Sequence, residues 1–128
     1  MNFTGVDHIA IIGHDADRML EFYVEHLGFS ILEDHDRPEK EDRLILVEKN
    51  GLVLELFVKP RAPKRPALPH PEQTGLRHLA FKVEDVEATL DYFDQVGISH
   101  QGLRYDDFNQ KKMAFFFDPD GLPLELHE

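Results

Sequence analysis

Residues 5–11 read GVDHIAI, and residues 75–81 read GLRHLAF. Each stretch has a glycine three positions before a histidine and ends in an apolar run. The two histidines, His8 and His78, are separated by 70 positions. Self-similarity at a fixed period is the sequence signature of a repeated structural unit.

A second match in the chain has the same offset. Residues 51–57 (GLVLELF) recur 70 positions later as residues 121–127 (GLPLELH). Two separate matches at one offset predict that the chain contains two copies of one module. The predicted parts of this single domain over residues 1–128 are a module at 5–58, a linker at 59–74 and a module at 75–127.

Each copy is expected to fold in the order β-α-β-β-β, which makes the protein α+β. In the first copy the apolar residues 5–12 predict a strand, and Asp15 precedes a helical pattern that stops at Gly28. The remaining elements expected in this copy are strands at 29–33, 43–48 and 52–58, with a loop or ragged hairpin at 34–42. The second copy repeats the order, with a strand at 76–83, a helix from Asp85 to Val96 and three more strands.

The overall composition limits the classes of partner. The chain has 128 residues, with 14 Lys and Arg against 25 Asp and Glu, so its net charge is -11. Nucleic acid and anionic membrane surfaces are not expected partners, because both need a basic face. The absence of cysteine excludes a disulfide scaffold and a thiolate metal site. The sequence has no pattern of a signal peptide, and the expected location is the cytoplasm.

The alternation of side chains along the predicted strands places the histidines and glutamates on the sheet face that no helix covers. Glu55 and Glu125 point away from the leucine rows of their strands, and the leucine rows suit the single helix of each module. His8 and His78 are expected on the same uncovered face as the glutamates. Two imidazoles and two carboxylates form a donor set that suits a divalent first-row metal ion.

Such a metal site would be of the open, catalytic type. Four protein ligands on an octahedral ion leave two positions for water or substrate. The ion would polarise a carbonyl and stabilise an enediolate, while one carboxylate takes a proton next to the carbonyl. The alternative for any one of these residues is an ordinary polar side chain on a wet sheet face. The same His-to-Glu separation in both copies favours the shared site.

These residues resemble those of a known family. Paired β-α-β-β-β modules with one His and one Glu in each are similar to the vicinal oxygen chelate superfamily, which includes glyoxalase I, extradiol dioxygenases and fosfomycin- and bleomycin-resistance proteins. Residues 75–81, 110–112 (QKK) and 118–126 (DPDGLPLEL) resemble small glyoxalase-I-like metalloproteins of the YaeR type. The resemblance spans nearly the whole chain and implies the vicinal-oxygen-chelate fold.

The resemblance also implies roles for single residues. His8, Glu55, His78 and Glu125 match the four metal ligands of glyoxalase I, and Glu125 matches the ligand that acts as the catalytic base. The implied cofactor is one divalent ion, with Zn²⁺ or Ni²⁺ favoured over Mn²⁺, Co²⁺ or Fe²⁺. Ile12 stands where glutathione-using bacterial glyoxalases carry an arginine, which argues against a glutathione adduct as the substrate.

Three functions remain open at this stage. The leading one is a metal-dependent lyase or isomerase that acts on a small oxygenated metabolite through an enediolate. The others are a binding or resistance-type sequestering protein, in which the metal only anchors a ligand, and an Fe(II) extradiol-type dioxygenase. A homodimer is expected, because a chain of this length exposes sheet edges.

Several further residues are weaker candidates. Those expected to line the pocket or to bind an anionic group of a small-molecule substrate are Phe57, Phe116, Arg43, Lys111 and Arg104. The linker is interpreted as a solvated, semi-rigid spacer, and the alternative is that its basic residues lie over an anionic ligand. The other six histidines are interpreted as surface or loop residues, with His127 closest to the predicted site.

Overall fold

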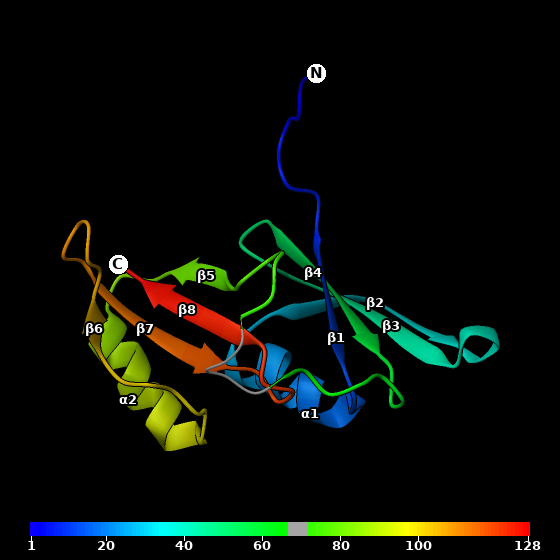
Figure 1. Ribbon diagram of the computed structural model, residues 1–128. Coiled ribbons are helices and arrows are strands. Elements are labelled where there is room, and N and C mark those ends of the chain that lie inside the picture. Colours follow the sequence, from blue (N-terminus) through cyan, green and yellow to red (C-terminus); the bar gives the residue numbers. More distant parts are fainter. Residues whose placement is uncertain (67–71) are drawn as a thin grey trace. The chain divides into compact units, whose positions relative to one another are not determined.

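The computed structural model describes residues 1–66 and 72–128 (Figure 1). These residues form two compact units, Met1–Lys64 and Arg65–Glu128. Pro69, His70 and Pro71 of the predicted linker lie outside the described residues. Among the described residues, every helix is too short or too polar to cross a membrane.

The first unit contains a four-stranded sheet and one helical segment. Its elements in chain order are β1 (Ile9–Gly13), α1 (Ala16–Leu20), the π-helix η1 (Glu21–His26), β2 (Ser30–Arg37), the 3₁₀ turn η2 (Pro38–Lys40), β3 (Asp42–Lys49) and β4 (Leu52–Val58). The strand order is β1-β4-β3-β2. Strand β1 runs parallel to β4, and the other pairs are antiparallel.

The second unit repeats this plan. Its elements are β5 (Leu79–Lys82), α2 (Val86–Val96), β6 (Arg104–Tyr105), β7 (Lys112–Phe117) and β8 (Pro123–His127). The strand order is β5-β8-β7-β6, with β5 parallel to β8 and the remaining pairs antiparallel. The predicted α+β class with tandem β-α-β-β-β modules is confirmed.

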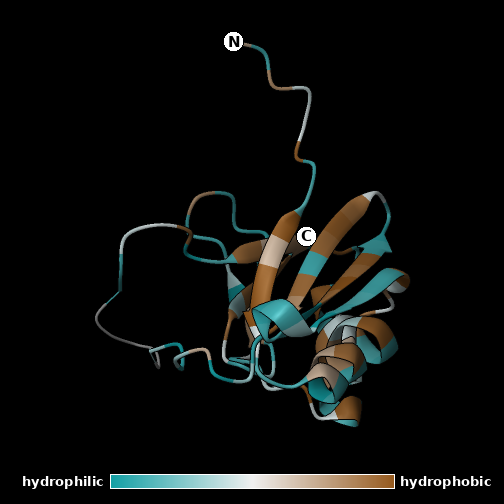
Figure 2. Ribbon diagram, turned by 90° about the vertical axis from the view of Figure 1, so that its right-hand side faces the viewer, coloured by the Kyte–Doolittle hydropathy of each residue, from teal (hydrophilic) through white to brown (hydrophobic). Residues whose placement is uncertain are grey.

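The core of each unit lies on the face of the leucine rows. In β4 the buried positions alternate as Leu54, Leu56 and Val58. In β8 the corresponding buried leucines are Leu124 and Leu126. Phe116 of β7 is paired with Leu124, and its ring contacts Phe93 of α2 at 4.8 Å between centroids. Figure 2 shows the corresponding concentration of hydrophobic residues in the strands.

The first helix differs from the simple helical pattern. After α1 the chain continues as a π-helix, in which the Leu27 amide donates to the Phe22 carbonyl at 2.9 Å. Phe22 and Tyr23 of this turn are both buried, and their ring centroids are 4.8 Å apart. A spacing of apolar residues does not distinguish this winding from an α-helix, since both keep one buried side.

Three strand boundaries also differ from the prediction. The parallel ladders begin at Ile9 opposite Leu54 and at Leu79 opposite Leu124, so the residues before them have no strand partner. Strand β2, in contrast, extends through residues 34–37, which were expected to be a loop or ragged hairpin. Cross-strand ion pairs between charged residues of β2 and β3 support this extension.

Candidate metal centre

In the first unit, His8 and Glu55 face each other. His8 lies one residue before β1, and Glu55 is paired in register with Ala10 of that strand. The His8 Nε2 atom is 3.0 Å from the Glu55 Oε1 atom. On its other side, the His8 Nδ1 atom is 2.7 Å from the Asp7 carboxylate. This hydrogen bond, assisted by the charge of Glu55, raises the pKa of His8 above its usual value.

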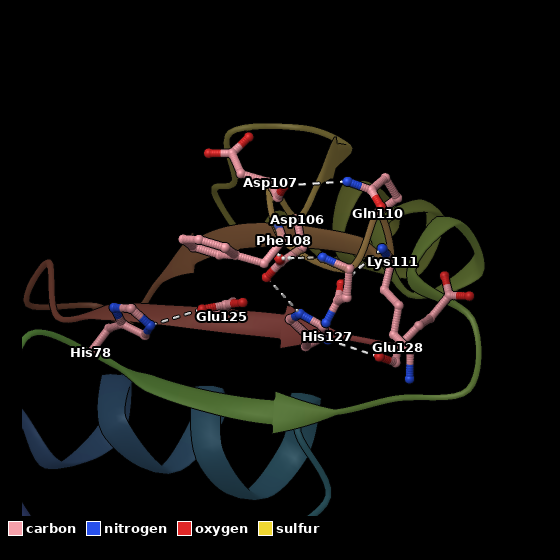
Figure 3. Close-up of polar contacts among 10 residues, drawn as sticks. His78, Asp106, Asp107, Phe108, Gln110, Lys111, Glu125, His127 and Glu128 are labelled. Atoms are coloured by element: carbon pink, nitrogen blue, oxygen red, sulfur yellow. Dashed lines mark hydrogen bonds and ion pairs between the residues drawn. The ribbon is translucent and has the colours of Figure 1, made fainter.

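In the second unit, His78 and Glu125 form the equivalent pair. Figure 3 shows the His78 ring pointing toward Glu125 on β8, and its Nε2 atom is 2.8 Å from the Glu125 Oε2 atom. Glu125 is buried, with 7% of its surface exposed. The His78 Nδ1 atom is buried and has no hydrogen-bond partner among the described residues.

The two pairs occupy the same position in the two sheets. Glu55 is opposite Ala10, and Glu125 is opposite Ala80, in parallel ladders of the same kind. Each histidine lies two residues before its alanine, so its side chain is on the same face of the sheet as that alanine and the paired glutamate. The repeat in the sequence is thus a repeat in geometry, with one imidazole and one carboxylate in each unit.

The chemistry of each pair fits a divalent ion. An imidazole nitrogen and a carboxylate oxygen are ligands that Zn²⁺ and Ni²⁺ accept. When the Nδ1–H group of His8 donates to Asp7, its Nε2 atom keeps a free lone pair, which is the usual arrangement of a metal-binding histidine. Asp7 was not predicted from the sequence, and the second copy has Arg77 at that position.

Each unit by itself supplies two donors. Within residues 1–66 and 72–128, no three side chains of His, Asp or Glu are gathered as a metal-binding group. The set of four ligands predicted from the sequence therefore stays a prediction, and so does the role of Glu125 as a base.

The aromatic residue beside Glu125 is Phe115, and the prediction of Phe116 as a pocket residue is wrong. Phe116 is fully buried and contacts Phe93 of α2, on the helix-covered face of the sheet. Phe115 is paired in register with Glu125, and its ring lies edge-on to His78 at 5.1 Å. Three consecutive phenylalanines show no alternation, so the sequence did not indicate which of them shares the glutamate face.

Two predicted cations lie away from the His–Glu pairs. Arg43 is in register with Val58 and shares the face of the buried residues, and its guanidinium binds the Asp34 carboxylate with contacts of 2.6 and 2.8 Å. Lys111 is exposed in the loop between β6 and β7. Phe57, in contrast, lies two residues after Glu55 on the same face of β4.

Two cations lie near Phe57, namely Lys59 of the predicted linker and Arg37, which the sequence did not single out. The Arg37 guanidinium is 5.3 Å and the Lys59 ammonium 5.7 Å from the centre of the Phe57 ring. Both cations also bind the buried carboxylate of Asp42, at 2.7 Å from Arg37 Nε and 2.6 Å from Lys59 Nζ. Hydrogen bonds from Arg37, which has the larger effect, and from Lys59 lower the pKa of Asp42 to about 2.

In the second unit, the corresponding end of the sheet carries His127. Its Nδ1–H group donates to the Glu128 carbonyl at 2.8 Å, and its Nε2 atom is 3.2 Å from the Asp106 carboxylate (Figure 3). The hydrogen bond to Glu128, which has the larger effect, and the one to Asp106 raise the pKa of His127. The period of two that links Glu125 and His127 is the sequence signal for this shared face.

A cavity of about 440 Å³ lies in the second unit, and His78 is one of the residues in its wall. Phe115 and Phe117 of β7 contribute its apolar surface, and Arg77 and Arg104 contribute positive charge. The candidate metal ligand of this unit therefore has space for a small molecule beside it.

Comparisons with known proteins agree with this architecture. Residues 5–126 match the family model of the Glyoxalase/Bleomycin resistance protein/Dioxygenase superfamily. The uncharacterized protein YaeR of Escherichia coli is 41% identical over 96% of this chain and 95% of its own length. The crystal structure of a glyoxalase family protein from Enterococcus faecalis has 48% identity and a TM-score of 0.93, and the match covers 100% of both chains.

A relative named for an enzyme activity is more distant. A probable lactoylglutathione lyase of Synechocystis is 30% identical over 93% of this chain and 91% of its own length. The family match covers nearly all of the chain, including both His–Glu pairs. The chain therefore belongs to the Glyoxalase/Bleomycin resistance protein/Dioxygenase superfamily.

Proposed function

We propose that this protein is a metal-dependent lyase or isomerase of the glyoxalase I type, which acts on a small oxygenated metabolite through an enediolate. The observation that carries the proposal is the recurrence of one His–Glu pair at the same register in both units. A single pair would be weak support, because an exposed ion pair on a sheet is common.

In this proposal His8, Glu55, His78 and Glu125 together hold one divalent ion, with Zn²⁺ or Ni²⁺ favoured over Mn²⁺, Co²⁺ or Fe²⁺. When bound, the ion would polarise a carbonyl of the substrate and stabilise the negative charge that develops on its oxygen. The two glutamates balance the charge of the ion, which limits the cost of holding it in a partly buried place.

Glu125 is the proposed proton acceptor. It is the more buried of the two glutamates, and Phe115 lies opposite it in the sheet. Its carboxylate would take the proton from the carbon next to the substrate carbonyl and return it to the neighbouring carbon, so that the product is an isomer of the substrate. A carboxylate shielded from water by an aromatic side chain is suited to such a transfer.

The substrate is proposed not to be a glutathione adduct. Ile12 is in register with Phe57, on the same face as Glu55, and 53% of its surface is exposed. An apolar side chain at this place gives no ion-pair partner to a peptide carboxylate. Lactoylglutathione lyase activity is therefore expected to be absent or very low.

Metal analysis tests the proposed ligand set. The wild-type protein is expected to purify with, or to take up, stoichiometric Zn²⁺ or Ni²⁺, while Glu55→Ala and His78→Ala lose it. His35→Ala is a suitable control, because His35 is an exposed histidine whose ring nitrogen is 3.2 Å from Glu33. Full metal content in both Glu55→Ala and His78→Ala would reject the assignment.

Proton exchange tests the reaction. The metal-loaded protein in deuterated water is expected to exchange the proton next to the carbonyl of small hydroxyketones and ketoaldehydes, as read by NMR. Glu125→Gln should reduce the rate by about 100-fold or more, since it removes the proton acceptor. Exchange that is unaffected by Glu125→Gln would contradict the role of this residue.

The competing proposal is a binding or resistance-type sequestering protein. The exposed Ile12 favours it, because together with Phe57 it offers apolar contact to a ligand on the Glu55 face. A ligand that binds the metal-loaded protein tightly and is recovered unchanged, without exchange of its proton, would support this alternative. Oxygen uptake with catechols would instead indicate a dioxygenase.

We further propose that the chain forms a homodimer. Strands β1, β2, β5 and β6 are edge strands of their own sheets, and open edges are commonly covered by another chain. Sedimentation at micromolar concentration is expected to give twice the mass of the chain. A monomer under these conditions would contradict the proposal.

A further inference from the structure

We infer that the substrate carries an anionic group, a carboxylate or a phosphate, which binds the Arg104 guanidinium in the cavity beside His78. The inference deepens the proposed function, because it takes this cavity as the place of the substrate. Its evidence is the charge and the packing of the cavity wall.

The first observation is the side of the sheet on which Arg104 lies. Arg104 of β6 is paired with Met113 of β7, and Phe115 follows Met113 by two residues. Phe115 is in turn paired with Glu125. Residues in register or two positions apart share a face, so Arg104, Phe115 and Glu125 point to the same side of this sheet.

The second observation is the contact between these side chains. The Arg104 guanidinium carbon is 5.7 Å from the centre of the Phe115 ring. The His78 ring is 5.1 Å from the same centre. The guanidinium and the imidazole are therefore separated by no more than the sum of these two distances, which a molecule of a few carbon atoms can span.

The third observation is the lack of a carboxylate partner for Arg104. Among the described residues its contact is with the Phe115 ring, whereas Arg77 binds Glu72, Arg37 binds Asp42 and Arg43 binds Asp34. A contact with the face of a ring uses no hydrogen-bond donor of the guanidinium. Arg104 thus lies beside Phe115 with donors available for an oxyanion.

The fourth observation is the sign of charge in the cavity wall. The chain as a whole has a net charge of -11, which repels anions. Of the charged residues that the structure describes in the cavity wall, three are arginines, Arg65, Arg77 and Arg104, and one is acidic, Glu72. A positive cavity in an acidic protein selects for an anionic ligand at short range, where the local charges dominate over the distant ones.

Three probes that share a hydroxyketone group test the inference. Dihydroxyacetone phosphate carries a phosphate, hydroxypyruvate carries a carboxylate, and dihydroxyacetone is neutral. Their dissociation constants are measured by calorimetry with wild-type protein, Arg104→Gln and Arg104→Lys. Arg18→Gln is the matched control, because it removes an exposed arginine of α1 in the first unit and changes the net charge equally.

The wild type is expected to bind at least one anionic probe more tightly than dihydroxyacetone. Arg104→Gln should weaken that binding by about 10-fold or more, the usual effect of losing a charge-assisted hydrogen bond, and leave dihydroxyacetone unchanged. Arg104→Lys should fall between, because it keeps the charge but loses the planar fork. The probe that responds more strongly identifies the anion as phosphate or carboxylate.

Two results would overturn the inference. One is equal affinity of the wild type for all three probes, and the other is an equal effect of Arg104→Gln and Arg18→Gln. Metal content is measured on the same samples, and the titrations are repeated after chelation. If the protein binds metal but shows no preference for the anionic probes, only the inference is rejected. If the protein binds no metal but shows a preference that depends on Arg104, only the proposed function is rejected.

Discussion

At the scale of single residues, Asp42 is a buried acidic group outside the His–Glu pairs. Its carboxylate is completely buried and is bound by Arg37 and Lys59. Asp42→Asn should lower the melting temperature by about 5 °C, because it leaves two cations close together without their shared anion. Asp34→Asn, which breaks the more exposed pair with Arg43, should lower it by about 2 °C or less in the same thermal unfolding experiment. Equal effects of the two substitutions would contradict this ranking.

The pKa of Asp42 predicts how this contribution depends on pH. Hydrogen bonds from Arg37 and then Lys59 lower the pKa from 3.8 to about 2. A carboxylate with a lowered pKa stabilises the folded state above its unfolded pKa and loses that contribution as the pH falls through the folded value. The difference in melting temperature between wild type and Asp42→Asn should therefore be constant from pH 7 to 5 and shrink toward pH 2. A difference that grows on acidification would show that the carboxylate is not the stabilising group.

Sequence reasoning at the residue scale succeeded where alternation was clear. The single acidic residue in each LEL stretch fixed the faces of Glu55 and Glu125. It was wrong for Phe116, because a run of three phenylalanines has no polar position to mark the outer face. It also named Arg43 as a candidate and did not single out Arg37. The face on which each arginine lies depends on how far the β2–β3 hairpin extends, which charged residues alone do not indicate.

At the scale of elements, α2 shows how local signals set a boundary. The Asp85 carboxylate accepts a hydrogen bond from the Ala88 amide at 2.9 Å, and Gly97 ends the helix with a φ of 80°. Asp85→Ala should destabilise the second unit by about 1 kcal/mol, because it removes the N-cap. Glu84→Ala, one residue before the cap, should be nearly neutral. Chemical denaturation of both variants measures the difference, and equal stability of the two would contradict the capping role.

The elements themselves were largely predictable, and their ends were not. The helix caps and the Asn50-Gly51 turn are local signals, so α2 and the β3–β4 hairpin follow directly from the sequence. The first strand of each module was predicted too long, because its start depends on where the parallel partner begins. His8 and His78 were predicted within these strands, but they lie just before β1 and β5.

At the scale of the whole molecule, the duplication gives each unit one His–Glu pair of the proposed metal site. Each unit has its own sheet, its own buried core and one His–Glu pair. The neighbourhoods of the pairs have diverged, because Asp7 supports His8 whereas Arg77 stands at that position in the second copy. The cations have diverged as well, since Arg37 is neutralised by Asp42 and Arg104 is not paired with a described carboxylate. Such divergence is expected when one half mainly holds a metal ion and the other also holds the substrate.

This division predicts a strongly non-additive response to substitution. If one ion needs both pairs, Zn²⁺ at 100 times its dissociation constant should stabilise the wild type by about 2.7 kcal/mol relative to chelated protein, read as a rise in melting temperature. Glu55→Ala and His78→Ala should each abolish this rise, although each leaves the pair of the other unit intact. The double variant should then respond no less than either single variant, because residues that act on one bound ion are coupled. Two independent sites would give the opposite pattern, with about half of the rise lost in each single variant and all of it only in the double variant.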